Sequence, residues 1–273
     1  MRENPEKPSR LEAVELTETL RQAALSSYVT AFGTASFAGR DADAPSSLPF
    51  SLRELPYAVS IGFRLSDVVM DSLTDRPTRT YQYHYRQVNI FIDQTLLRLL
   101  SKIHELGFKG FPVPASQIVD WEANTGHLAH KVVARECGLG WIGRNNLLVS
   151  PDYGARMRYG SLFTNMPLEA EKGSQVRGAV EGASGVKGGA SGSDRGSDSA
   201  SGFDVWGCGV CRACARACPA SAIGETRESF DLVKCTQMLK QFSKEENIGS
   251  MICGLCIKAC KGTGSRHASR DRG

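Results

Sequence analysis

The feature that most constrains this chain is the segment CGVCRACARACP, which contains Cys208, Cys211, Cys214 and Cys218. This C-x2-C-x2-C-x3-C-P spacing is typical of bacterial ferredoxins. Three of the thiolates bind one [4Fe–4S] cluster there, and the fourth binds a second cluster. Zinc sites instead pair their cysteines in two separated knuckles. Pro219 fixes its own φ and favours the turn that directs Cys218 away from the first three cysteines. The run therefore predicts ligands for two iron–sulfur clusters.

A shorter motif, CGLCIKAC at residues 253–260, supplies further thiols. Its last cysteine can complete the first cluster, which leaves the second cluster one thiolate short. Cys235 is the remaining cysteine of this region, and it can fill that place. The alternative is that Cys235 packs within a helix, DLVKCTQMLKQF, and that the second cluster has three ligands. We predict Cys208, Cys211, Cys214 and Cys260 for the first cluster, and Cys218, Cys235, Cys253 and Cys256 for the second.

The remaining composition favours metal binding over disulfide bonds. A chain of 273 residues buries a sizeable core without cysteine cross-links. The N-terminal segment has no apolar export signal, and no run of apolar residues is long enough to span a membrane. We therefore expect a cytoplasmic protein, in which clustered cysteines are metal ligands. The ninth cysteine, Cys137, lies far from the others and is expected to be a buried thiol. The net charge of +4 is weak support for an acidic partner.

Helical and strand patterns alternate over residues 1–170, which predicts an α/β domain. Ser9 and Glu12 fit a capping box, Thr125 fits an N-cap, and Gly107 and Gly138 fit helix ends. The expected helices are 10–28, 84–106 and 125–137, and the expected strands are 57–63, 108–116, 146–150 and 157–165.

The composition changes sharply after this domain. Residues 171–202 are rich in glycine and serine and contain no aromatic side chain, which predicts a flexible linker or surface insertion. Residues 203–262 form the cysteine-rich module. Residues 263–273 form a basic tail that is expected to be loose.

The glycine-rich segment GLGWIG, from Gly138 to Gly143, formally matches a dinucleotide-binding fingerprint. That fingerprint requires a strand before the glycines and a helix after them. Here a helical pattern precedes the glycines and a strand pattern follows, so we do not expect a dinucleotide site.

The segment GHLAHKVVARECGLGWIGRNNLLVSPDYGARMRYGSLFTN, followed by the cysteine module, resembles the epoxyqueuosine reductase family. It is more distantly similar to corrinoid-dependent reductive dehalogenases. The resemblance covers residues from about 55 to 170 and 203 to 262. Few residues follow Cys260, where longer family members continue with a helical repeat region, so the resemblance is to a short form.

The resemblance implies a nitroreductase-like α+β core with a mixed sheet, followed by a ferredoxin module with two [4Fe–4S] clusters. It also implies a cobalamin in the first domain, an external electron donor (ferredoxin, flavodoxin or a reductase), and tRNA or a small molecule as substrate. A flavin in the same pocket is the alternative cofactor. The residues expected to contact this cofactor are Gly138, Leu139, Gly140, Trp141, Gly143 and Asn145.

Three side chains are candidates for proton transfer. The family carries an aspartate in a V-D-S-A-P-like segment that this chain lacks, and Asp120 is one of the acids near the corresponding place. His127 and His130 are spaced so that they would share a helix face. Solvated or hydrogen-bonded structural histidines are the alternative for this pair. For the whole chain, the alternative to a reductase is a ferredoxin-like electron carrier that serves a partner enzyme.

Overall fold

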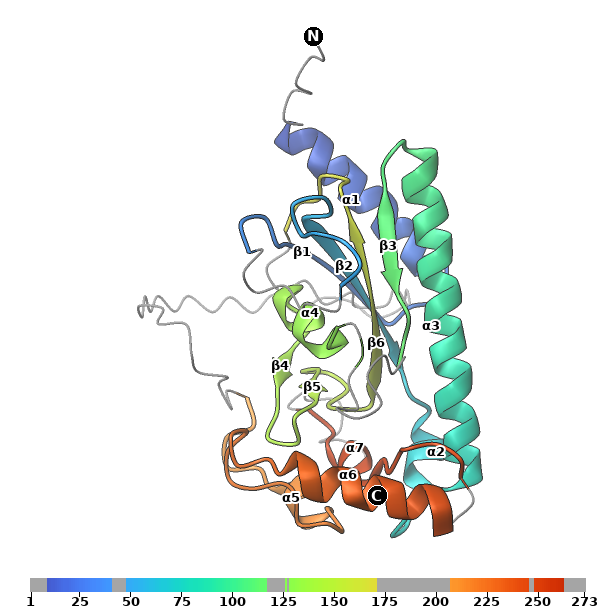
Figure 1. Ribbon diagram of the computed structural model, residues 1–273, viewed down its shortest axis with the longest axis vertical. Helices are drawn as coiled ribbons and strands as arrows, with labels where there is room; N and C mark the ends of the chain where they lie inside the picture. Colours follow the sequence, from blue (N-terminus) through green and yellow to red (C-terminus); the bar gives the residue numbers. More distant parts are fainter. Residues whose placement is uncertain are drawn as a thin grey trace, which may run out of the picture.

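The computed structural model describes residues 9–40, 48–116, 126, 128–170, 207–245 and 248–262. A four-stranded sheet lies at its centre, with helices on both faces and the cysteine segments gathered at one end (Figure 1). The predicted linker at 171–202 and the basic tail at 263–273 lie outside the described residues. None of the described helices has the length and apolarity that crossing a membrane requires.

The central sheet has the strand order β1-β2-β6-β3, and each neighbouring pair is antiparallel. The predicted mixed sheet is therefore wrong for the described strands. The two strands that flank β6 never pair with each other, so no parallel ladder forms between them. The strands predicted near 57–63, 108–116 and 157–165 are confirmed, whereas β1 was not predicted. Their bounds are β1 Ala31–Ser36, β2 Tyr57–Arg64, β3 Gly110–Val113 and β6 Met157–Thr164.

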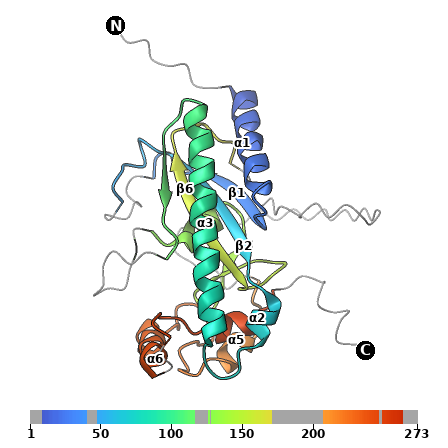
Figure 2. The same ribbon diagram turned by 90° about the vertical axis from the view of Figure 1, so that its right-hand side faces the viewer.

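One face of the sheet is covered by α1 (Arg10–Leu25) and the long helix α3 (Arg79–Glu105), as Figure 2 shows. The predicted cap is confirmed, because the Ser9 hydroxyl accepts a hydrogen bond from the Glu12 N–H at 3.2 Å. Gly107 ends α3 in the left-handed region at φ +84°, as its position predicted. α3 begins earlier than predicted and runs the length of the sheet to the cysteine segments.

The opposite face is covered by α4 (His130–Glu136), which is shorter than the predicted helix. Its N-cap is Ala129, which makes no side-chain capping bond, and the predicted cap Thr125 lies outside the described residues. Cys137 follows α4 and is fully buried, with its Sγ 4.0 Å from the Ala58 carbonyl. It is therefore the buried thiol that the sequence predicted.

A two-stranded hairpin, β4 (Trp141–Ile142) and β5 (Leu148–Val149), follows α4. Its loop is closed by hydrogen bonds from the Gly143 N–H to Leu147 and from the Asn146 N–H back to Gly143, both 2.9 Å. Helix before and strand after is the reverse of the dinucleotide-binding order. The element order that the sequence patterns predicted around the glycines is therefore confirmed.

The cysteine segments pack against the end of α3 through a shared apolar core. In that core Ile252 and Leu255 join Leu73 and Tyr81, all of them buried. The short helices of this end of the molecule are α2 Asp67–Asp71, α5 Ala213–Arg216, α6 Leu232–Glu245 and α7 Leu255–Ala259.

Candidate metal centres and cofactor cavity

The hairpin loop binds the sheet domain to the cysteine segments through a buried arginine. Arg144 is 4% exposed, and its guanidinium donates hydrogen bonds to the carbonyls of Gly209 and Glu225. Burying a cation costs free energy unless its N–H donors are satisfied. The two carbonyls therefore fix the position of the hairpin loop against the cysteine segments. No sequence pattern predicted this role, although Arg144 follows the glycine-rich segment directly.

Trp141, at the base of the hairpin, packs on the first cysteine loop. Its indole Nε1 donates a hydrogen bond to the Cys208 Sγ at 3.5 Å. Gly207 lies flat against the ring, because a Cβ there would come within 2.6 Å of Trp141. Gly143 is close to the same thiol, since a Cβ there would lie 3.4 Å from the Cys208 Sγ. This part of the glycine-rich segment therefore contacts a predicted cluster loop.

The first predicted ligand set is brought together by loops far apart in sequence. Burial, together with the nearby thiols of Cys260, Cys208 and Cys211, raises the pKa of the Cys214 thiol to about 11. Burial also raises the pKa of Cys260, again with contributions from Cys208 and Cys211. These mutual effects place the four thiols in one neighbourhood. Cys211 is exposed, so this set lies near the surface.

The second predicted ligand set lines a single cavity of about 240 Å³. Burial raises the pKa of Cys256 well above its usual value, with further contributions from Cys253, Cys235, Cys214 and Cys218. Cys235 thus lies beside the other three members of its set. Cys214 belongs to the first set, and its contribution to the pKa of Cys256 indicates that the two sets are neighbours. The thiols that line this cavity are Cys218, Cys235, Cys253 and Cys256.

The surroundings of this cavity are mostly apolar. Its walls include the apolar side chains of Ile223, Phe230, Leu239 and Met238. Among the described residues, no three His, Cys, Asp or Glu side chains already stand in metal-binding geometry. The chemistry of the donor set nevertheless fits an iron–sulfur cluster, because four cysteines line one small, mainly apolar cavity.

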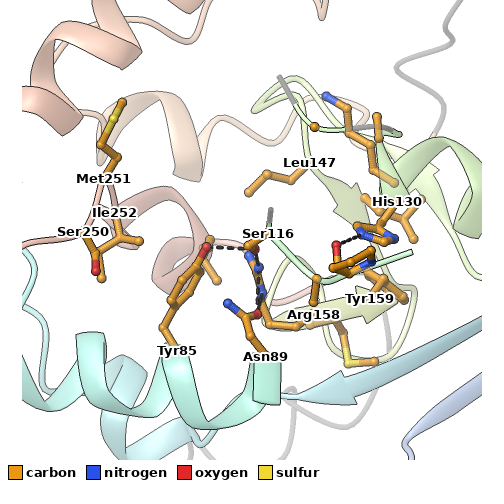
Figure 3. Close-up of a pocket in the computed structure, with 18 of the residues that line it drawn as sticks. Tyr85, Asn89, Ser116, His130, Leu147, Arg158, Tyr159, Ser250, Met251 and Ile252 are labelled. Atoms are coloured by element: carbon orange, nitrogen blue, oxygen red, sulfur yellow. Dashed lines mark hydrogen bonds between the residues drawn. The ribbon is translucent and has the colours of Figure 1, made fainter. Parts of the chain in front are cut away.

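A larger cavity of about 770 Å³ lies between the sheet domain and the cysteine segments (Figure 3). Its walls come from α3, β6, the loop after β3, the start of α4 and the segment 249–252. The volume lies in the range usual for small-molecule and cofactor sites. Lys131 and Leu147 line both this cavity and the one that contains the second cysteine set. The two spaces are therefore neighbours.

One wall of the large cavity holds a fixed positive charge. The Arg158 guanidinium lies 4.3 Å from the centre of the Tyr85 ring and donates hydrogen bonds to the Asn89 Oδ1 at 3.1 and 3.0 Å. It also donates to the Ser116 hydroxyl. Burial opposes ionisation of Tyr85, but the charge of Arg158 and the hydrogen bonds with Ser116 and Asn89 outweigh it and lower the pKa of the phenol. Figure 3 shows these side chains grouped on one side of the cavity.

His130, a predicted proton-transfer residue, lines this cavity but uses both ring nitrogens. Its Nε2 lies 3.1 Å from the Pro114 carbonyl, and its Nδ1 lies 3.0 Å from the Ser161 hydroxyl. Because a carbonyl only accepts, Nε2 carries the proton and Nδ1 accepts from Ser161. Burial lowers the pKa of His130 to about 4, so the ring is neutral at neutral pH. This geometry favours the structural alternative for His130.

The other predicted site residues lie in two places. Asp120 and His127 are outside the described residues, although Ser116 and Gly126, the described residues nearest to them, line the large cavity. The predicted cofactor contacts do not line that cavity. Leu139 is core, and Asn145 lines the cavity of the second cysteine set. The predicted contacts concerned are Gly138, Leu139, Gly140, Trp141, Gly143 and Asn145.

Several cavity residues were not predicted, among them Tyr85, Asn89, Arg158 and Tyr159. They come from α3 and β6, which are distant in sequence. No local motif in the chain marks them. Their spacing predicts only ordinary helix and strand positions.

No protein-family model matches the chain. In sequence, the epoxyqueuosine reductase of Listeria monocytogenes is 31% identical over 103 residues, which cover 37% of this chain and 19% of that protein. The epoxyqueuosine reductase of Pseudomonas aeruginosa is 23% identical over 200 residues, covering 70% of this chain and 43% of that protein. The chain is similar to epoxyqueuosine reductases. The matched part spans less than half the length of these two relatives.

The fold is also shared with a solved reductive dehalogenase that is described as supporting a mechanism for B12-dependent dehalogenation. The TM-score is 0.64 at 15% sequence identity, and the alignment covers 94% of this chain and 33% of that one. At this identity the likeness shows the fold alone.

Proposed function

We propose that this protein is an iron–sulfur reductase in which two [4Fe–4S] clusters deliver electrons to a corrinoid bound in the large cavity. The first cluster is held by Cys208, Cys211, Cys214 and Cys260. The second is held by Cys218, Cys235, Cys253 and Cys256.

The observation that carries this proposal is the placement of the second cysteine set. All four of its thiols line one small cavity, and that cavity shares Lys131 and Leu147 with the large one. A carrier that only passed electrons to a partner would have no use for a second, cofactor-sized space beside its inner cluster. The arrangement favours a reductase over a simple carrier.

The clusters would supply electrons one at a time. The first set is the natural entry point, because Cys211 is exposed and the neighbouring Val210 is 96% exposed. An external donor such as a ferredoxin, a flavodoxin or a reductase would dock there. The second set lies in a mainly apolar cavity that adjoins the large one, so it would be the exit.

The residues of the large cavity fit a corrinoid. Apolar side chains such as Met157, Met251 and Ile252 suit the body of a macrocycle, and Asn89 and Ser250 suit its polar amide periphery. A bound corrinoid would supply a redox-active cobalt at which an organic substrate is reduced. The protein would position that substrate, and Arg158 would offer a fixed charge to an anionic part of it. A flavin in the same cavity is the second candidate.

Sequence similarity to epoxyqueuosine reductases supports a modified base in tRNA as the substrate. A small organic molecule is the alternative substrate. Asp120 and His127 are the candidate proton donors for either reaction, because the described residues nearest to them line the cavity. His130 would position the cavity wall instead of donating a proton.

The cluster part of the proposal is tested by metal analysis after anaerobic reconstitution. We expect about eight iron atoms per chain, and about four after Cys235→Ser. Cys137→Ala is the matched control, since this buried thiol lies outside both sets, and its iron content should equal that of the wild type. An iron content of about four in the wild type would remove the second cluster.

The cofactor part is tested by titrating the reconstituted protein with cobalamin and following its absorbance. Saturable binding that is weakened by Met157→Trp, which fills the cavity, supports the corrinoid. Full clusters with no cobalamin binding, but with tight flavin binding, would favour the flavin reductase. Full clusters with neither cofactor would favour the electron carrier.

A further inference from the structure

The tip of the β4–β5 hairpin carries buried polar atoms that have no partner in the protein. Among the described residues, the buried side-chain nitrogens and oxygens without a hydrogen bond include the Arg144 Nε and the Asn145 Nδ2. A buried donor without a partner is destabilising, because it loses its hydrogen bonds to water and gains none in return. Two such atoms on neighbouring residues, at the point where the hairpin meets the cysteine segments, indicate a missing group.

The orientation of the Asn145 amide is settled by its neighbour. Its Oδ1 accepts a hydrogen bond from the backbone N–H of Leu147 at 3.3 Å, and only an oxygen can accept from that donor. The Nδ2 group, with its two N–H donors, is therefore on the other side of the amide. Asn145 is 3% exposed, so water outside the protein does not satisfy these donors.

Asn145 lines the same cavity as the second cysteine set. The other polar groups near it are already engaged: Lys131 Nζ donates to the Asn146 carbonyl and to its Oδ1, both at 2.8 Å. The cavity walls are otherwise mainly apolar side chains and the thiols of the set. Among the described residues that line this cavity, the sulfurs of the four cysteines, with whatever they hold, are the acceptors that we assign to the Asn145 Nδ2.

We propose that Asn145 donates an N–H···S hydrogen bond to the second cluster and thereby raises its reduction potential. The inference rests on the cluster assignment of the proposed function. On reduction the cluster gains one electron from an external reductant and its sulfurs become more negative. A fixed donor stabilises the reduced state more than the oxidised state, so the electron is held more readily at this cluster.

The test is a redox titration of the reconstituted protein, followed by the EPR signals of its reduced clusters. The signal that disappears in Cys235→Ser is assigned to the second cluster. We expect Asn145→Leu to lower the reduction potential of the second cluster by ~59 mV, which is a tenfold lower reduced-to-oxidised ratio at a given potential for one electron. Asn145→Asp keeps the acceptor for Leu147 but replaces the donor, and should lower the potential further.

The matched control is Trp141→Phe, which removes the indole donor to the Cys208 Sγ at 3.5 Å while keeping an aromatic ring. It should lower the potential of the first cluster and leave that of the second unchanged. Iron content and circular dichroism report whether each variant folds and is loaded.

The proposal is overturned if neither Asn145 variant shifts the second cluster, or if both clusters shift equally. It is also overturned if the wild-type protein binds iron for one cluster only. None of these measurements requires cobalamin, so failure of the corrinoid proposal is recognised separately, by an unshifted cobalamin spectrum in a fully loaded protein.

Discussion

The two cysteine sets differ in what encloses them. The first set reaches the surface at Cys211, beside the exposed Val210. On its inner side, Cys208 contacts the ring of Trp141. The second set lines an apolar cavity that Asn145 and α6 help to close, beside the larger cavity of the sheet domain. In the proposed function this difference separates an entry cluster from an exit cluster, because solvent contact and hydrogen bonding would set the two cluster potentials differently.

The strongest test of this difference compares Cys256→Ser with Cys211→Ser. Cys256→Ser should halve the iron content and abolish reduction of bound cobalamin by any donor, because the exit cluster is lost. Cys211→Ser should abolish reduction by a protein donor but leave reduction by a small diffusible reductant. Stopped-flow absorbance measures both rates. A Cys256→Ser protein that still reduces cobalamin at the wild-type rate would contradict the order entry-then-exit.

The next largest effect is expected at Arg144, which holds the hairpin against the first set. Arg144→Ala removes two charge-assisted hydrogen bonds to buried carbonyls, and should lower the free energy of unfolding by about 4 kcal/mol. Urea denaturation of the protein measures this loss. Arg98→Ala, at an exposed position of α3, is the control and should change stability by less than about 0.5 kcal/mol. Equal losses in both variants would mean that the hairpin contact adds no stability.

The contact between Trp141 and the loop that carries Cys208 can be tested by comparing alanine substitutions at two glycines of that loop. Gly207 and Gly209 both have positive φ, at +94° and +45°, but only a Cβ at Gly207 would collide with Trp141, at 2.6 Å. Both alanine variants carry backbone strain, whereas Gly207→Ala adds overpacking worth about 2 kcal/mol. Thermal unfolding should therefore separate the two variants. Equal midpoints would show that Trp141 can move aside freely.

The smallest effect concerns the cavity beside the second set and depends on pH. The folded pKa of His130, about 4, lies below its unfolded value near 6.5, so the unfolded chain binds the extra proton first. Stability should fall as the pH drops from about 6.5 to 4 and then level off. The shift corresponds to at most about 3 kcal/mol, and solvent screening of this partly exposed ring reduces it to about 1–2 kcal/mol.

Denaturation curves at several pH values, for the wild type and for His130→Gln, measure this contribution. His130→Gln should flatten the profile over this range. A profile as steep as that of the wild type would assign the pH dependence to other groups.

Local patterns predicted the main helices and three of the four sheet strands. Helix α3 was found because its apolar residues repeat with helical spacing over many turns. β1, with the sequence AFGTAS, was missed because its small residues carry no strand pattern of their own. It is a strand because it pairs along its length with β2, where Thr34 lies opposite Val59. The mixed sheet was wrong because strand direction depends on which strands are neighbours, and that is a long-range property.

The site divides in the same way. Cysteine number and spacing favoured two sets of four, with a three-ligand second set as the alternative, since cluster ligation fixes the number and type of donors. That the second set shares one cavity, and that Asn145 faces it, depended on the folded arrangement of the hairpin and α6. Arg158, Tyr85 and Asn89 meet only because β6 lies against α3.

The sequence by itself therefore determined the chemistry of the donors, because thiol number and spacing are written locally in the chain. Tertiary structure decided which space those donors face and what lies beside it. Packing between residues distant in sequence makes the large cavity, places the glycine-rich hairpin against Cys208, and leaves Asn145 as an unpaired donor next to the second set.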